Sequence, residues 1–394
     1  MTMKTNQNQN DPFSGWKRQI KDLIKEHPLQ IISWEATRRC NLKCVHCGSP
    51  AESVRLEDEL STDEVVGAFE QIMHDFDMTR FRHINITGGE PFVRKDLLKV
   101  LKRISRFPAY RNIDIQTNGI AIAEHPDLLA ELKAYGVTGL GISIDGLEET
   151  HDAFRKFKGG YAKAFCAAQL AVQHGYVVTV SVVAHAKNIE EIPSLFQVVK
   201  NQIKPRVFRL MTMDQIGRAE SLEEYKLSTM QFSQVIKFLQ NEYAKSCTGY
   251  GDPQSTMVEI GCGGWLGEEL EGLVRPFIFH CIAGINNLGI LFDGKLGACS
   301  NIPRNFIEGD LRKDRIKDVW ENGYQRHRQP DWKKVGVCKE CSEWEYCHGG
   351  PMHLRTSGSS SCQDCAFMIL RNYLKTPSDR VSGFADIIYE PTAH

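Results

Sequence analysis

The chain has 394 residues, of which 42% are hydrophobic and 25% are charged, and its formal net charge at pH 7 is −1. This composition is typical of a globular protein, and the length allows a large domain with a smaller one beside it. The balanced charge gives no broad basic field, so nucleic acid is not an expected partner. No apolar run approaches the ~20 residues that a membrane span needs. Residues 1–11 are too polar for a secretion signal, so we expect a cytoplasmic protein with no membrane span.

Thirteen cysteines are many for a chain expected in a reducing compartment, where grouped thiols indicate metal ligands rather than disulfides. Three lie near residue 44 and eight lie between residues 262 and 365. Cys166 falls on an apolar face of an expected helix and is predicted to be a core residue.

A polar tail and an amphipathic helix over 16–27 lead into a regular alternation of strand-like and helix-like segments from residue 31. The expected strands are 31–36, 83–87, 113–117, 139–144, 177–183 and 207–212. The expected helices are 62–76, 96–107, 126–135, 161–174, 190–201 and 229–246. Six consecutive strand–helix units require parallel strands with right-handed crossovers. The pattern therefore predicts an α/β fold, and a doubly wound sheet competes with a barrel as its architecture.

Three cysteines with the spacing Cys-x3-Cys-x2-Cys follow the first expected strand, namely Cys40, Cys44 and Cys47. Thiolates are soft ligands that suit iron–sulfur clusters. Three thiols on one loop can hold three corners of a four-iron cluster and leave the fourth iron open to a ligand. A zinc site is the alternative, although zinc normally takes a closed set of four ligands, and three buried core cysteines are another.

Polar and glycine residues follow the next strands. Gly88, Gly89 and Glu90 come after the second strand, where two glycines allow a close backbone approach. A turn before a helix would explain the glycines equally well. Arg155 carries a guanidinium that suits a carboxylate partner, although a solvated surface arginine is the plainer interpretation.

These motifs together resemble the radical S-adenosylmethionine (SAM) enzymes. The resemblance implies a partial (β/α)6 TIM-type barrel over 31–246, after a tail and lead-in helix over 1–30, with an open side that admits a bulky substrate. It also implies that Cys40, Cys44 and Cys47 hold a 4Fe–4S cluster that binds SAM. Reductive cleavage of SAM would give a 5′-deoxyadenosyl radical that abstracts a hydrogen atom from the substrate.

The same resemblance implies a set of SAM contacts, in which Arg155 pairs with the carboxylate of SAM and His46 packs on its adenine. The implied contacts are Gly88, Gly89, Glu90, Thr117, Asn118, Ser143, Asp145, Arg155 and His46.

After residue 247 the strand–helix rhythm ends, so we place a bridging segment at 247–275 and a second domain at 276–394. Residues 288–298 predict a hairpin with its turn at Asp293-Gly294. The spacing Cys338-x2-Cys341-x5-Cys347 resembles the SPASM domain, a cysteine-rich module that carries auxiliary four-iron clusters. Pro351 stands where that pattern usually has a further cysteine.

Eight cysteines suffice for two auxiliary 4Fe–4S clusters, and two of them, Cys362 and Cys365, lie where the pattern usually has one. Three alternatives stay open: Cys362 and Cys365 could be exchanged between the sets, there could be only one auxiliary cluster, or residues 338–365 could hold zinc. The predicted sets are Cys338, Cys341, Cys347 and Cys365 for one cluster and Cys262, Cys281, Cys299 and Cys362 for the other.

The resemblance implies an enzyme that modifies a peptide or protein, served by an external one-electron donor of the flavodoxin or ferredoxin type. Alternatives are oxidation of a Ser or Cys in a sulfatase, biosynthesis of a haem or quinone cofactor, and an iron–sulfur or zinc binding protein without enzymatic activity. About 30 residues precede the first strand, too few for a leader-binding domain, so a peptide leader would bind the barrel or a separate protein. Asp214, at the expected barrel mouth, has no assigned role.

Overall fold

A computed structural model describes residues 13–49, 55–247, 255–355 and 365–371. In these ranges a single ten-stranded sheet has the order β10-β9-β8-β1-β2-β3-β4-β5-β6-β7. The six predicted strands are present as β1 (Ile31–Thr37), β2 (His83–Gly88), β3 (Ile113–Thr117), β4 (Val137–Ser143), β5 (Val177–Ala184) and β6 (Val207–Thr212), and each pairs in parallel with the next.

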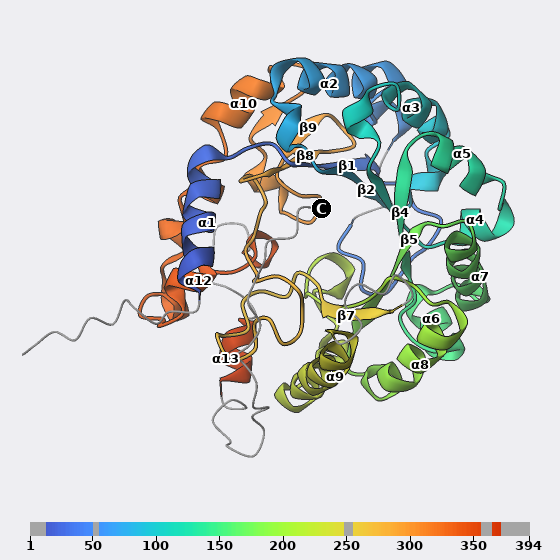
Figure 1. The fold of residues 1–394 in the computed structure, drawn as a ribbon, viewed down its shortest axis with the longest axis vertical. Helices are drawn as coiled ribbons and strands as arrows, with labels where there is room; N and C mark the ends of the chain where they lie inside the picture. Colours follow the sequence, from blue (N-terminus) through green and yellow to red (C-terminus); the bar gives the residue numbers. More distant parts are fainter. Residues whose placement is uncertain (1–12, 50–54, 248–254, 356–364, 372–394) are drawn as a thin grey trace, which may run out of the picture.

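Helices cover the outer face of this curved sheet (Figure 1). The predicted helices are present, with ends that differ by a few residues. They are α1 (Ser14–Glu26), α2 (Thr62–Asp75), α3 (Leu97–Ile104), α5 (Leu128–Ala134), α7 (Gly160–Gln173), α8 (Ile192–Gln202) and α9 (Thr229–Cys247). Two short helices were not predicted, α4 (Ile120–Glu124) and α6 (Glu148–Arg155), because each spans less than three turns and gives little periodic signal.

The two faces of the sheet differ in character. Side chains that point toward the helices, such as Ile84, Ile86 and Val180, are fully buried. On the alternate, inner face many side chains are polar, among them the half-buried Asn85 and Gln116, and the amide of Gln116 donates to Asn85 Oδ1 at 3.3 Å. Because successive residues of a strand face opposite sides, the apolar core lies between sheet and helices while the interior of the barrel is polar.

A seventh parallel strand, β7 (Met257–Ile260), pairs with β6 and lies inside the segment predicted as a bridge. At the other end of the sheet, β8 (Asn287–Ile290) pairs in parallel with β1. β7 and β10 (Gly309–Asp310) are the two terminal strands and do not pair with each other, so the barrel is open between them. The fold is thus a partial TIM-type barrel, as predicted.

The predicted hairpin is confirmed. β8 and β9 (Lys295–Gly297) are antiparallel, and Gly294 in the turn has φ +84°, a backbone conformation that glycine adopts without a steric penalty. The remaining helices of this part are α10 (Ile316–Asn322), α11 (Gln325–Arg328), α12 (Trp344–Cys347) and α13 (Ala366–Leu370).

The prediction that Cys166 is a core residue is wrong, because its side chain is exposed on α7. The buried stripe of that helix runs through Ala164, Ala167, Ala168 and Ala171, with the i, i+3, i+4, i+7 spacing of one helix face. Cys166 lies outside that stripe.

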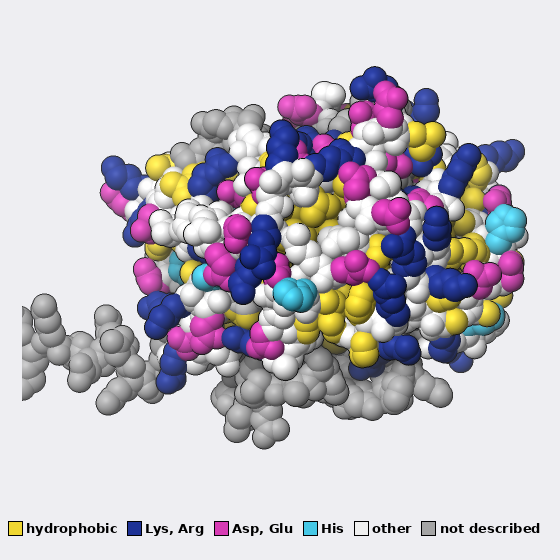
Figure 2. All heavy atoms as spheres, turned by 90° about the horizontal axis from the view of Figure 1, so that it is seen from above, with side chains coloured by type: hydrophobic (Ala, Val, Ile, Leu, Met, Phe, Trp, Pro, Cys, Tyr) yellow, Lys and Arg dark blue, Asp and Glu magenta, His cyan; other side chains and the backbone are white. Residues whose placement is uncertain are grey.

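Lysine and arginine side chains alternate with acidic ones over the face seen in Figure 2, in keeping with the near-neutral net charge. Within the described ranges, no helix combines the length and the apolar character needed to cross a bilayer.

Candidate active site and cysteine centres

The loop after β1 brings Cys40, Cys44 and Cys47 together at the carboxyl end of the strand. Cys44 is buried and the other two are half-buried. The pKa of Cys40 is raised to about 11, mainly by burial, and the charges of Glu90, Cys44 and Cys47 act in the same direction. Burial also raises the pKa of Cys44. Buried thiols of this kind fit a cationic centre, because a bound metal favours the thiolate form.

The backbone of this loop rests on the Gly88-Gly89 pair. The amide of Gly89 donates to Thr37 O at 2.8 Å, and the amide of Glu90 donates to Arg39 O at 2.9 Å. A Cβ on Gly88 would lie 2.1 Å from Thr37 O, and one on Gly89 would lie 2.2 Å from Arg39 O. The glycines are therefore required by the cysteine loop that crosses them.

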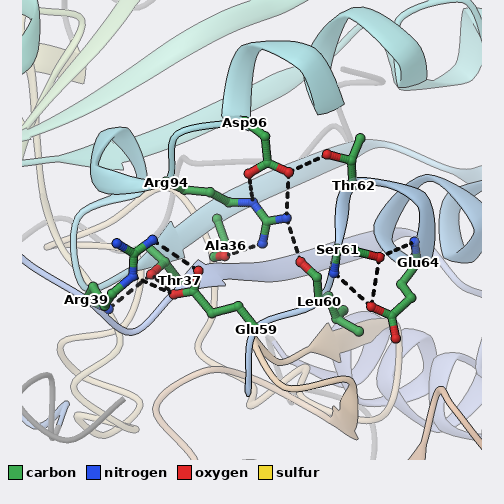
Figure 3. A network of polar contacts seen from close by, with 10 residues as sticks. All are labelled: Ala36, Thr37, Arg39, Glu59, Leu60, Ser61, Thr62, Glu64, Arg94 and Asp96. Atoms are coloured by element: carbon green, nitrogen blue, oxygen red, sulfur yellow. Dashed lines mark hydrogen bonds and ion pairs between the residues drawn. The ribbon is translucent and has the colours of Figure 1, made fainter. Parts of the chain in front are cut away.

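A network of polar contacts holds the start of the same loop at the end of β1 (Figure 3). Arg39 donates to both carboxylate oxygens of Glu59, at 3.0 and 3.1 Å, and the Thr37 hydroxyl donates to Glu59 as well. Arg94 is 3% exposed and donates to Ala36 O at 2.9 Å and to Leu60 O at 2.7 Å. The sequence analysis missed Glu59 and Arg94, since only the folded chain brings them to the end of β1.

Glu90 links the ends of β2 and β3. It is 2% exposed, and its carboxylate accepts from the Thr117 hydroxyl and from the Asn118 amide, both at 2.8 Å. Burial raises the pKa of Glu90, and these hydrogen bonds oppose that shift. The side-chain amide of Asn118 also donates to Asn41 Oδ1 at 2.8 Å. Three of the predicted SAM contacts thus form one network that reaches the cysteine loop.

Asp145 and Arg155 form a buried ion pair beside the same loop. The guanidinium Nε lies 2.5 Å from Asp145 Oδ2, and its Nη1 lies 3.7 Å from the Cys44 thiol. Although burial acts to raise it, the pKa of Asp145 is lowered to about 2, mainly by the charge of Arg155. The Val183 amide donates to Asp145 Oδ1 at 2.9 Å. Arg155 therefore presents a fixed positive charge to the cysteine centre.

His46 stacks on Phe154, with ring centroids 4.5 Å apart and planes 8° apart. One face of the imidazole is thus covered by Phe154. Burial lowers the pKa of His46 to about 3, so the ring is neutral. Ser143 is half-buried at the end of β4.

Arg218, in the loop after β6, was not predicted. Its amide donates to Cys47 O at 3.0 Å and its Nε donates to Cys44 O at 2.8 Å. The cysteine loop is therefore held between the second strand and the sixth.

Near the C-terminus, the four cysteines of the first predicted auxiliary set line one pocket. Trp265 and Trp344 form part of its wall. Arg355 is fully buried and its Nη2 lies 3.7 Å from the Cys338 thiol. The lining cysteines are Cys338, Cys341, Cys347 and Cys365.

Three members of the second predicted set also lie together. Cys262 keeps solvent-accessible surface although dense protein surrounds its sulfur. These surroundings, together with the charges of Cys281 and Cys299, raise the pKa of its thiol well above the usual range. The segment that carries it packs against Pro351, since a Cβ on Gly264 would lie 3.4 Å from Pro351 Cδ. The fourth predicted member, Cys362, lies outside the described residues.

No three His, Cys, Asp or Glu side chains in the described parts of the chain are arranged as a site for a single metal ion. The cysteines of the pocket are instead spread around its walls.

Comparison with known families identifies two domains. Residues 34–199 match the radical SAM superfamily, and residues 281–342 match SPASM, an iron–sulfur cluster-binding domain. The chain carries a radical SAM domain followed by a SPASM domain. As a radical SAM protein with a SPASM domain, it uses SAM and 4Fe–4S clusters as cofactors.

Similar proteins differ in their substrates. The radical SAM protein is 27% identical over 340 residues to Fe-coproporphyrin III synthase of Methanosarcina barkeri, covering 81% of this chain and 82% of that one. It is 25% identical over 373 residues to the PqqA peptide cyclase of Rhizobium meliloti, covering 90% and 92%. The structure of anSMEcpe with bound AdoMet and a peptide has the same fold, with 20% identity, a TM-score of 0.65, and coverage of 88% of this chain and 96% of that one.

Proposed function

We propose that this radical SAM enzyme modifies a peptide or protein substrate. The observation that carries the proposal is the meeting of the Cys40–Cys47 loop with Glu90 after β2 and with Arg155, the last residue of α6, which pairs with Asp145 after β4. Barrel enzymes hold their active sites at the carboxyl ends of the strands. Similarity to a peptide cyclase along nine-tenths of both chains supports the substrate class.

When bound, the cluster and SAM supply a 5′-deoxyadenosyl radical that abstracts a hydrogen atom. The chain's own residues prepare the site for this chemistry. Cys40, Cys44 and Cys47 hold the cluster, Glu90 positions Thr117 and Asn118 beside it, and Arg155 offers a cation to a carboxylate. The remaining proposed SAM contacts are Gly88, Gly89, Ser143, Asp145 and His46.

The open edge of the barrel between β7 and β10 supports access by an extended chain. Asp214 follows β6 near this opening and pairs with His353 of the C-terminal part, with Nε2 and Oδ2 3.0 Å apart. The pair brings polar side chains from both domains to the barrel mouth. A peptide bound there would meet the barrel on one side and the SPASM domain on the other.

We infer two auxiliary clusters, one held by the pocket of Cys338, Cys341, Cys347 and Cys365 and one by Cys262, Cys281, Cys299 and Cys362. Contact between the segment that carries Cys262 and Pro351 supports this division. Pro351 stands where the SPASM pattern usually has a cysteine, and Cys262 could supply the missing thiol. Electrons would come from a flavodoxin- or ferredoxin-type donor.

Modification of a porphyrin is the second candidate, and the similarity to Fe-coproporphyrin III synthase favours it. Transfer of deuterium separates the two candidates, because abstraction moves a substrate hydrogen into 5′-deoxyadenosine. We expect deuterium in this product with a deuterated peptide fraction and none with a deuterated precursor of iron-coproporphyrin III. The opposite result would establish the porphyrin reaction instead.

Iron content tests the cofactor assignment. Three 4Fe–4S clusters predict about twelve irons per chain after anaerobic reconstitution. The C40A/C44A/C47A variant should retain about eight irons and lose SAM cleavage. A wild-type content of about eight, falling to four, would mean one auxiliary cluster. Zinc in place of the auxiliary iron would contradict the assignment.

A further inference from the structure

Lys333 is a buried lysine at the auxiliary cysteines. It ends the 3-10 turn Pro330–Lys333 and is 4% exposed, whereas the next residue, Lys334, is exposed. Its side chain runs along Gly349, where an added Cβ would lie 2.9 Å from Lys333 Cβ and 3.3 Å from its Cδ. Lysine is almost never fully buried unless its charge is compensated. The ammonium therefore requires a negative partner.

Among the described residues, none of the ion pairs joins Lys333 to a carboxylate. Gly349, against which Lys333 packs, lines the pocket of the auxiliary cysteines, and three thiols contribute negative charge at its ammonium. Burial lowers the pKa of Lys333, and the charges of Cys281, Cys347 and Cys338 oppose that shift. Cys281 belongs to one proposed auxiliary set, and Cys338 and Cys347 belong to the other. Lys333 thus lies within electrostatic reach of both sets.

The other basic side chains nearby add no negative charge. Arg355 brings a second cation, 3.7 Å from the Cys338 thiol. Clusters held by these thiolates would add negative charge to this buried region.

We propose that Lys333 is a counter-cation shared by the two auxiliary clusters, and that it stabilises their reduced states. This inference rests on the proposed pair of clusters. A cluster that accepts one electron becomes more negative by one charge, and a fixed cation nearby favours that state. Net charge and burial are among the features that set iron–sulfur reduction potentials. Loss of the Lys333 charge should therefore lower both potentials.

Potentiometric titration followed by electron paramagnetic resonance tests the proposal. The full chain carries the C40A/C44A/C47A background, so that only auxiliary clusters give signals. K333M removes the charge at similar length, K333R keeps it, and K334M removes an exposed charge from the adjacent position. We expect lower midpoint potentials for both signals in K333M, and potentials near the parent values in K333R and K334M.

Iron content is measured first in every variant. A parent protein with only one auxiliary cluster, or none, would overturn the proposed cluster pair itself. With both clusters present, unchanged potentials in K333M, or a shift in only one signal, would overturn the shared role of Lys333. If K333M loses iron, retention of iron and potential in K333R supports the role of the charge, whereas loss in K333R overturns it.

Discussion

Gly89 lies against the carbonyl oxygen of Arg39 so closely that a Cβ on the glycine would stand 2.2 Å from it. The second strand and the cysteine loop are therefore in contact through backbone atoms alone. A substitution at Gly89 must move the loop that carries Cys40, Cys44 and Cys47.

We expect Gly89→Ala to lose the first cluster, because relief of the overlap costs about 2 kcal/mol or more in a packed site. Iron per chain should fall by about four, together with SAM cleavage. Gly67→Ala is the matched control, since Gly67 is exposed in α2 with nothing within 4 Å of the added carbon. Alanine should leave iron unchanged and stabilise the helix by about 0.5–1 kcal/mol. Full iron content in Gly89→Ala would contradict this explanation of the glycine.

Arg94 should be a major source of stability at the end of β1. Arg94→Met leaves the buried carbonyls of Ala36 and Leu60 without this donor, so we expect a loss of about 3 kcal/mol in the free energy of unfolding. Urea titration followed by circular dichroism measures it. Arg55→Met removes an ion pair in which Arg55 is 73% exposed, and should change stability by less than about 1 kcal/mol. Equal effects of the two variants would refute the importance of burial.

Glu90→Gln should weaken SAM binding. The carboxylate accepts from the Phe92 and Asn118 amides and from the Thr117 hydroxyl. An amide nitrogen cannot accept, so at least one of these donors loses its partner at a cost of about 1–3 kcal/mol. We expect the Kd for SAM to rise about tenfold or more, measured by anaerobic calorimetry. Glu149→Gln, on the exposed side of α6, should leave the Kd unchanged.

Glu64 should stabilise the contact between α2 and the C-terminal part in a pH-dependent way. Its hydrogen bond from Arg312 is the main reason that its pKa is lowered to about 2. A carboxyl with a depressed folded-state pKa stabilises the fold above its unfolded value of about 4.3, and this contribution disappears as pH falls toward 2. Because Glu64 is 35% exposed, we expect only about 1 kcal/mol at pH 7.

The free energy of unfolding of the wild type minus that of Glu64→Gln, measured at the same pH, gives this contribution. The difference between them should shrink from pH 7 to pH 3, and Arg312→Met should reduce it to the part that comes from the hydrogen bonds of Ser61 to Glu64. A difference that grows in acid would have the wrong sign for this pair.

The sequence by itself determined the barrel strands and the chemistry of the cysteine loop. Strands such as Ile31–Thr37 and helices such as α2 depend on local periodicity and capping, and the spacing of Cys40, Cys44 and Cys47 lies within one loop. Short-range patterns of this kind can be recognised without knowing where the rest of the chain lies.

Only the tertiary structure decided which residues surround those motifs. β8 pairs with β1 although about 255 residues separate them, and β7 is a strand because β6 lies beside it. Arg94, Arg218 and Lys333 have unremarkable neighbours in sequence, and their importance comes from burial against distant backbone or thiols. Burial of a charged group depends on the packing of the whole chain, which no local pattern records.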